Sequence, residues 1–249
     1  MKICGISDFH GNLLQNIPTC DVLCICGDIF PLNIQRDLNH SKYWFENKFI
    51  PWAMKQNCKV LIVPGNHDFY LESLYKKNEL TNTNAMIPSN IRILVDELYE
   101  YGDITFYGTP WIEPINFQKG KWAFEYTDKS VYSKVPDCDI LLSHDSPLHN
   151  NIMRNLIKTK HKYWLYGHWH SDASYPQCNW YNCSRLDDNY NFKKNYEYVT
   201  FDIMSKETIE QEFLDMLIED AEQIPNSNKV IIKFLNMYKH KEIENDDKD

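Results

Sequence analysis

The sequence predicts an α/β fold, and three features of the chain lead to this prediction. Several short runs of valine, isoleucine and leucine have the length and composition of strands buried on both faces of a parallel sheet. Each run ends at a polar cluster, often through a glycine, as strands do at a ligand-binding edge. Helical stretches lie between several of the runs. We therefore expect parallel strands whose carboxyl ends carry the functional side chains.

Three of these runs lie in the first quarter of the chain, and each leads into charged or polar residues. The expected strands with their clusters are residues 2–7 with Asp8 and His10, residues 21–26 with Gly27-Asp28, and residues 58–63 with Gly65-Asn-His-Asp68. Asp8 and His10 share one face, because side chains alternate along an extended segment. A short helical turn is expected at residues 13–17.

The later part of the chain repeats this arrangement. The expected strands are residues 91–95 and 104–107 on either side of a turn at 101–103, residues 139–143 followed by His144, residues 163–166 followed by Gly167-His-Trp-His170, and weaker strands at 178–183 and 197–203. The expected helices are residues 35–56, kinked or divided at Pro51 because proline cannot donate a backbone hydrogen bond, residues 70–80 and residues 151–158. Residues 81–90, rich in threonine and asparagine, are expected to form an exposed loop.

The domain organisation follows from length and charge. A chain of 249 residues is long enough for one large domain with a substantial core. We expect this domain at residues 1–205, a helical extension packed on it at 206–240, and a charged, disordered tail at 241–249. Residues 206–249 contain six lysines against twelve acidic residues, so most of the net charge of −9 belongs to this segment.

Composition argues against several classes of protein. No apolar run approaches the roughly 18 residues of a membrane span, and the N-terminal residues lack the pattern of a signal peptide. The eight cysteines are scattered, with no Cys-x-x-Cys pair, which indicates reduced thiols in a cytoplasmic protein. There is no long basic stripe of the kind that follows a nucleic-acid backbone. We therefore expect no membrane partner and find no strong nucleic-acid signal.

The polar clusters together predict a metal site. If their strands are neighbours, they gather two carboxylates, one amide and several imidazoles in one place, with no cationic side chain among them. Such a group is repulsive unless a cation lies within it. Nitrogen and oxygen ligands without thiolate suit manganese, with iron or zinc as alternatives. The ligands are too many for one tetrahedral zinc, so two divalent ions sharing a bridging carboxylate, roughly 3.5–4 Å apart, fit better.

Each cluster taken alone has an ordinary structural explanation. Asp-x-His and Gly-Asp occur often by chance, and Gly-Asn-His-Asp could be a turn with capping side chains. The prediction rests on the order of the clusters and on their position after apolar runs. The histidines assigned to structural roles are His40, His149, His161 and His240, of which His149 could line the pocket. The Trp169 ring is expected to point away from the metals into the core, with substrate stacking as the alternative.

In this order, Asp8-x-His10, Gly27-Asp28, Gly65-Asn-His-Asp68, His144 and Gly167-His-x-His170 resemble the calcineurin-like metallophosphoesterase superfamily. The resemblance implies a four-layer α/β/β/α sandwich with two metal ions between the ends of the central sheets. It implies that Asp8, His10, Asp28 and His170 bind the first ion and that Asp28, Asn66, His144 and His168 bind the second, with Asp28 as the bridge. It also implies that His67 acts catalytically over the substrate phosphate, with Asp68 orienting it, while a metal-bridging hydroxide attacks phosphorus in line.

The subfamily is indicated by what the motifs contain. The chain lacks the Gly-Asp-x-x-Asp-Arg-Gly and Gly-Asn-His-Glu signatures of serine/threonine phosphatases. Its short length and its Gly108-Thr-Pro-Trp111 segment look more like the small phosphodiesterases that act on cyclic nucleotides and aryl phosphates. The expectation is a phosphodiesterase, monomeric or homodimeric, acting on a small phosphorylated, nucleotide-like substrate. The alternatives are a nuclease that acts on short or single-stranded nucleic-acid ends and a metal-stabilised scaffold without catalysis.

Overall fold

A computed structural model describes residues 1–116, 121–194, 197–204, 208, 211 and 213–217. Contacts within the chain divide it into two units, Met1–Asp202 and Ile203–Asp249. In the second unit, residues 213–217 are helical. Most of the expected helical extension at 206–240 and all of the tail at 241–249 lie outside the described residues, so the domain boundaries and the packing of the extension stay predictions.

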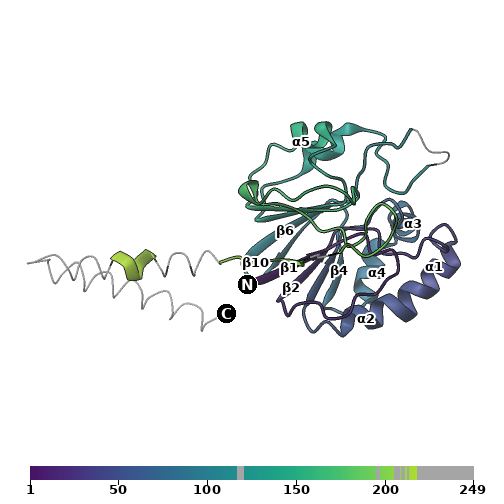
Figure 1. The fold of residues 1–249 in the computed structure, drawn as a ribbon, viewed down its shortest axis with the longest axis horizontal. Helices are drawn as coiled ribbons and strands as arrows, with labels where there is room; N and C mark the ends of the chain where they lie inside the picture. The colour runs from purple at the N-terminus through teal and green to yellow at the C-terminus, as the bar shows by residue number, and fades with distance from the viewer. Residues whose placement is uncertain (117–120, 195–196, 205–207, 209–210, 212, 218–249) are drawn as a thin grey trace, which may run out of the picture. The chain divides into compact units, whose positions relative to one another are not determined.

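The first unit contains two five-stranded sheets (Figure 1). In spatial order the first sheet consists of β10 (Val199–Asp202), β1 (Lys2–Ile6), β2 (Val22–Ile25), β3 (Lys59–Ile62) and β4 (Ile91–Ile93). Strands β1 to β4 are parallel, and β10 is antiparallel to β1. Ile6, Ile25 and Ile62 are partners across neighbouring strands, so β1, β2 and β3 end at the same level.

The second sheet is also mostly parallel. Its order is β5 (Glu97–Tyr101), β6 (Ile104–Thr109), β7 (Ile140–Ser143), β8 (Tyr163–Tyr166) and β9 (Trp180–Asn182). Only the β5–β6 pair is antiparallel. The two sheets face each other, since a Cβ atom added to Gly5 of β1 would lie 3.4 Å from the Leu165 side chain of β8.

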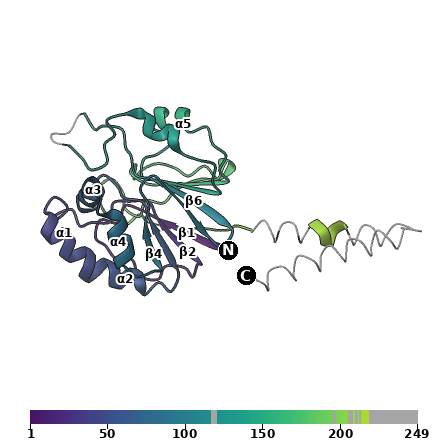
Figure 2. The ribbon, with the colours of Figure 1, turned by 180° about the vertical axis from the view of Figure 1, so that it is seen from behind.

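Helices cover the outer faces of both sheets. On the first sheet lie α1 (Leu38–Trp44), a π-helical segment (Phe45–Phe49), α2 (Ile50–Met54), α3 (Phe69–Lys76) and α4 (Leu80–Met86), and on the second lie a 3₁₀-helix (Lys129–Lys134) and α5 (Asn151–Leu156) (Figures 1 and 2). An exposed 3₁₀-helix (Pro176–Cys178) precedes β9. One core joins Phe45, Phe49 and Ile62, and another joins Met153 and Trp164. The order is helix, sheet, sheet, helix, so the predicted four-layer α/β/β/α sandwich is confirmed.

Several local predictions need correction. Residues 13–17 contain no helix. The expected loop at 81–90 is mostly helix α4, because the buried Asn84 side chain exchanges hydrogen bonds with the backbone of Ile93 and ties this segment to the sheet. Residues 91–93 and 104–109 belong to different sheets, and the partner of β6 across the turn is β5, which was not predicted. The expected helix at 35–56 is three consecutive helical segments from Leu38 to Met54, with Pro51 in the first turn of α2.

Candidate functional site

The predicted ligands come together at the carboxyl ends of both sheets. Asp8, Asp28 and Asn66 follow β1, β2 and β3, which end at the same level, while His144 follows β7 and His168 and His170 follow β8. A parallel bridge between Ser7 and Ser184 joins the strand ends of the two sheets. Segments distant in the sequence therefore contribute to one buried group of side chains.

One half of this group is centred on an amide oxygen. Oδ1 of Asn66 lies 2.8 Å from Nε2 of His144 and 2.8 Å from Nδ1 of His168. The same His144 nitrogen lies 3.4 Å from Oδ1 of Asp28. These contacts link Asp28, Asn66, His144 and His168, the four residues that the resemblance implies for the second ion.

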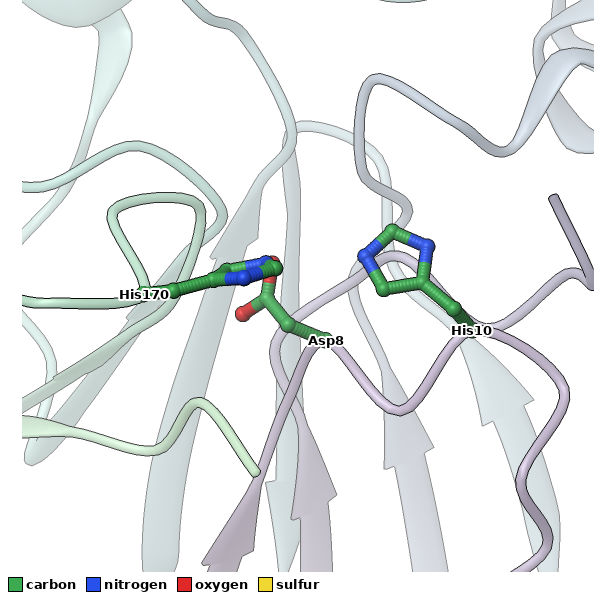
Figure 3. Close-up of side chains that lie close together, drawn as sticks. All are labelled: Asp8, His10 and His170. Atoms are coloured by element: carbon green, nitrogen blue, oxygen red, sulfur yellow. The ribbon is translucent and has the colours of Figure 1, made fainter. Parts of the chain in front are cut away.

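The other half contains the ligands implied for the first ion. Figure 3 shows Asp8 between the imidazoles of His10 and His170, which come from different loops. Nε2 of His170 lies 3.4 Å from Oδ1 of Asp8, and Nε2 of His10 lies 3.7 Å from Oδ2 of Asp28. One potential ligand atom from each of Asp8, His10 and His170 lies within 4.8 Å of the other two. Asp28 is close to both halves, as a bridging carboxylate must be.

Hydrogen bonds outside the group orient two of the imidazoles. Nδ1 of His144 lies 2.7 Å from the carbonyl oxygen of Cys26, and Nδ1 of His170 lies 2.8 Å from that of Asp187. A carbonyl oxygen only accepts, so in both rings Nδ1–H is the donor. The lone pair of a neutral ring is then on Nε2, which faces the carboxylates. Metal-binding histidines are generally held in this way.

His10 provides the test of whether a metal pair fits. Both of its ring nitrogens are buried without a hydrogen-bond partner among the described residues, and its side chain is 1% exposed. A buried imidazole with two unpaired nitrogens is costly. A cation held by His10 and Asp28 would give this imidazole a partner and would compensate the charge of the buried carboxylates. The donor set therefore fits divalent metal ions.

The pKa values of the imidazoles agree with this role. Burial lowers the pKa of His10 to about 3 and that of His168 to about 4, so both rings are neutral and able to bind a cation. Burial opposes protonation of His170 as well, but its hydrogen bond with Asp8 and the charge of that carboxylate raise its pKa to about 9. A metal ion bound there takes the place of this proton.

The two carboxylates respond to the same surroundings in opposite ways. Burial, together with the charges of Asp8 and Asp68, raises the pKa of Asp28 well above its ordinary value. Burial acts in the same direction on Asp8, but the hydrogen bond from His170 and the charges of the surrounding histidines hold its pKa well below the usual range. Without a cation, one of two neighbouring carboxylates is therefore forced towards its neutral form.

The backbone at the ligands is unusual. Asp8, His10, Asp28 and His168 all lie in the left-handed region, with φ of 51°, 41°, 56° and 67°. Residues other than glycine are uncommon in this region, and such conformations gather at functional sites. Gly65 is needed for close approach, because a Cβ atom there would lie 2.6 Å from Cε1 of His144.

His67 lies beside the ligands, and its partner is a residue that the sequence did not indicate. Its Nδ1 is hydrogen-bonded to Oε1 of Gln35. Its Nε2 lies 3.8 Å from Oδ2 of Asp28, and its backbone N–H donates to Oδ1 of the same residue at 2.8 Å. One potential ligand atom from each of His10, Asp28 and His67 lies within 4.8 Å of the others, so the ring borders the cluster. Its expected place over the phosphate stays a prediction.

Asp68 does not orient His67 in this structure, which corrects the role predicted for it. The two side chains form neither a hydrogen bond nor an ion pair, although both residues are described. The Asp68 carboxylate instead accepts hydrogen bonds from the backbone N–H groups of Gly65, Asp28, Ile29 and Phe30, at 2.6, 2.9, 2.9 and 3.3 Å. Asp68 is fully buried and ties the loop after β2 to the loop after β3.

We expect Asp68→Ala to lower the free energy of unfolding by at least about 3 kcal/mol, because several buried N–H groups lose a charged acceptor. Urea unfolding of the metal-free protein measures the effect. The surface variant Glu100→Gln on β5 is the control and should unfold as the wild type does. A loss of activity with unchanged stability would restore a direct catalytic role for Asp68.

A cavity of about 480 Å³ opens beside the ligand group. Its lining includes Asp28, Asn66, His67, His168 and His170, together with three aromatic side chains, Trp122, Trp169 and Tyr190. None of the described residues that line it is a lysine or an arginine. The cavity is therefore continuous with the ligands and has aromatic walls.

The position of Trp169 differs from the prediction, whereas His149 lines the cavity, which the prediction for this residue allowed. Trp169 does not pack into the core but lines the cavity, 38% exposed, and its ring is stacked on His149 with centroids 4.0 Å apart and an angle of 15° between the planes. Nε2 of His149 is bound to Oδ1 of Asp172 at 2.5 Å, which fixes the pair. Trp122 also lines the cavity, and the centroid of its ring lies 4.6 Å from that of His67 and beneath the guanidinium of Arg36.

Comparisons with known proteins point in one direction. The family model of the calcineurin-like phosphoesterases matches residues 1–172, which contain every predicted ligand. UPF0046 protein T07D4.2 of Caenorhabditis elegans is 25% identical over 237 aligned residues, covering 76% of this chain and 56% of that protein. The chain thus spans little more than half the length of this curated relative. One solved crystal structure is similar over 70% of each chain, at 14% identity and a TM-score of 0.38, which is too low to carry an argument.

Proposed function

Because the chain belongs to the calcineurin-like phosphoesterase family, we propose that it is a phosphodiesterase for a small substrate carrying a planar aromatic group such as a nucleobase. A domain of this family indicates a metal-dependent hydrolase of phosphate esters, and the cluster of buried His and Asp ligands agrees with that chemistry. The choice of a diester and of a nucleotide-like substrate is the proposal.

The cavity supports this choice of substrate. Indole rings offer flat surfaces on which a nucleobase or an aryl group can stack. The Trp169 ring is stacked on His149, and the Trp122 ring lies beneath the guanidinium of Arg36, so both indole rings are held in place. The described lining has no lysine or arginine and includes the carboxylates of Glu113 and Asp188, an environment that disfavours the many charges of a nucleic-acid backbone. A diester with a single negative charge fits these walls better.

The residues of the site have separate roles in the proposed hydrolysis. Divalent ions, when bound, neutralise charge on the phosphate and make water a nucleophile at neutral pH. Asp28 and Asn66 lie on two loops that are joined by hydrogen bonds to the Asp68 carboxylate, and this connection keeps their ligand atoms in place. Since Gln35 accepts from Nδ1 of His67, Nε2 is the atom that remains to exchange a proton with the substrate or its leaving group. Manganese is the proposed ion, with iron or zinc as alternatives.

Location and assembly are also part of the proposal. Among the described residues, no helix combines the length and apolar character needed to cross a bilayer. All eight cysteines are free thiols, which supports the cytoplasm as the location. A monomer or homodimer acting on a small phosphorylated substrate is consistent with a cavity enclosed by one chain.

A substrate panel tests the proposed function. The full chain is loaded separately with manganese, iron and zinc and assayed on cyclic nucleotides, bis(p-nitrophenyl) phosphate, p-nitrophenyl phosphate and short single-stranded DNA. We expect kcat/KM for the diesters to exceed that for the monoester by about 10-fold or more, which is the effect of one well-placed contact between the enzyme and its substrate. Salt-sensitive cleavage of DNA in preference to small diesters would instead support the nuclease. No hydrolysis with any metal would support the scaffold.

A further inference from the structure

The loop after β9 contains a compact turn that positions Tyr190. The backbone N–H of Asp187 donates to the carbonyl of Asn191, and that of Tyr190 donates to the carbonyl of Asp187, both at 2.8 Å. Oδ1 of Asp187 accepts from the backbone N–H groups of Asn189 and Asn191, at 2.9 Å each. The Asp187 side chain and backbone therefore hold the turn together.

The same turn is connected to the ligand group. The carbonyl of Asp187 that accepts from Tyr190 also accepts from Nδ1–H of His170 at 2.8 Å. The carbonyl oxygen of Asp187 thus fixes both the ring orientation of His170, a predicted ligand, and the position of the backbone N–H of Tyr190. The position of Tyr190 relative to His170 is set by this shared acceptor.

The ring of Tyr190 lies against two ligands. It is edge-on to His10, with centroids 5.0 Å apart at 83°, and to His170, at 5.5 Å and 89°. Tyr190 lines the cavity and is 43% exposed. Its hydroxyl forms no hydrogen bond with any of the described residues, and a phenol beside buried carboxylates and imidazoles is an available donor.

The backbone of Tyr190 is in the left-handed region, with φ of 61°. A bulky residue is disfavoured there, and asparagine, which stands on both sides of Tyr190, takes this conformation more readily. Strained conformations of this kind persist where the surrounding structure requires them, and often at functional sites. Here the turn places a phenol at the mouth of the ligand group.

We propose that Tyr190 is a substrate-binding residue whose hydroxyl donates a hydrogen bond to a phosphate oxygen held at the Asp8, His10 and His170 side of the ligand group. The proposal rests on the function proposed above. It makes Tyr190 a contact for the phosphate itself, common to every ester the site accepts, whereas Trp122 and Trp169 contact the group attached to it.

Tyr190→Phe tests the proposal, because it keeps the ring, its packing on His10 and His170 and the backbone conformation while removing only the hydroxyl. We expect kcat/KM for an aryl phosphodiester to fall roughly 10- to 100-fold, the loss of one hydrogen bond to a charged oxygen. In the metal-loaded protein, calorimetry should show a similar loss of affinity for inorganic phosphate. Metal content, measured by elemental analysis, should equal that of the wild type. Tyr43→Phe, on the exposed face of α1, is the matched control.

Three results of the comparison between Tyr190→Phe and wild type would overturn the proposal. They are equal phosphate affinity of Tyr190→Phe and wild type, phosphate binding too weak to detect in either, and loss of metal from Tyr190→Phe, which would assign the hydroxyl to the metal site. If the wild-type protein hydrolyses no ester, the proposed function is refuted. In that case the phosphate affinities of wild type and Tyr190→Phe still decide the role of Tyr190. Tyr190→Asn, which relieves the left-handed strain and removes the ring, should also bind phosphate more weakly; unchanged binding would overturn the proposal.

Discussion

Asp28→Asn should remove hydrolysis almost completely and lower the metal content from two ions to one or none. Asp28 is the side chain that lies near both halves of the ligand group, 3.4 Å from His144 and 3.7 Å from His10. The amide keeps the size of the side chain and an acceptor for the His67 backbone N–H, but it lacks the charge that a bridging ligand needs. Removing an outer-shell partner of a metal ligand typically costs 10–100-fold, so losing the bridge should cost at least about 100-fold.

The same variant should not destabilise the metal-free protein. Burial and the charges of Asp8 and Asp68 raise the pKa of Asp28 in the folded state. A carboxyl group with a raised folded-state pKa lowers stability at pH values above its unfolded-state pKa, and a neutral amide removes that effect. Urea unfolding in the presence of a chelator at neutral pH should therefore give an equal or higher free energy of unfolding than the wild type. Glu100→Gln controls for loss of a surface carboxylate.

The outcome that contradicts this prediction is simple to recognise. If Asp28→Asn retains both ions and wild-type hydrolysis, Asp28 is not the bridge. A fall in metal-free stability would show instead that the carboxylate serves the fold, with lost activity following from that damage.

His67→Ala should keep its metal ions and lose catalysis. Removing a positioned proton donor or acceptor typically lowers kcat by about 10²–10⁴-fold, and we expect an effect in this range on an aryl phosphodiester. Elemental analysis of the same preparation gives the metal content. His40→Ala is the control, because its imidazole is 72% exposed and, among the described residues, is bonded only to Asp37 at the start of α1.

Gln35 provides the companion variants. Gln35→Ala leaves Nδ1 of His67 without its acceptor and should lower kcat about 10-fold, the typical value of one hydrogen bond, with little change in KM. Gln35→Glu restores an acceptor at the same place and should recover part of the loss. If His67→Ala loses metal, His67 is a ligand, as its distance from Asp28 permits, and the catalytic role is wrong. If Gln35→Ala is fully active, Gln35 does not position His67.

The gathering of the predicted ligands in one place could be inferred because each one follows an apolar run, and parallel strands in register end at one edge. Asp8, Asp28 and Asn66 needed no knowledge of long-range contacts beyond that rule. The residues that surround the ligands could not be found in the same way. Gln35 was expected at the start of a helix but lies in the turn before α1, and Tyr190 is in a turn between asparagines, where its left-handed backbone has no signal in the residue type.

Asp68 and Trp169 show why local sequence assigns residues more reliably than roles. Both stand next to a predicted functional residue, and this adjacency suggested that Asp68 orients His67 and that the Trp169 ring points away from the metals into the core. In the structure, Asp68 turns away from His67 to the backbone of a loop 40 positions earlier in the chain, and Trp169 turns into the cavity to stack on His149. A side chain's partner depends on which other segment packs against it.

Apolar runs, glycine positions and the spacing of polar residues were enough to locate most of the buried strands and the set of candidate ligand types, because hydrophobic burial and backbone conformation are local consequences of residue type. Tertiary structure alone decided the distances between the candidate ligands, which acceptors orient their rings and which aromatic side chains line the cavity. Those relations depend on distances between loops that are far apart in the chain, and such distances are set only when both sheets are packed.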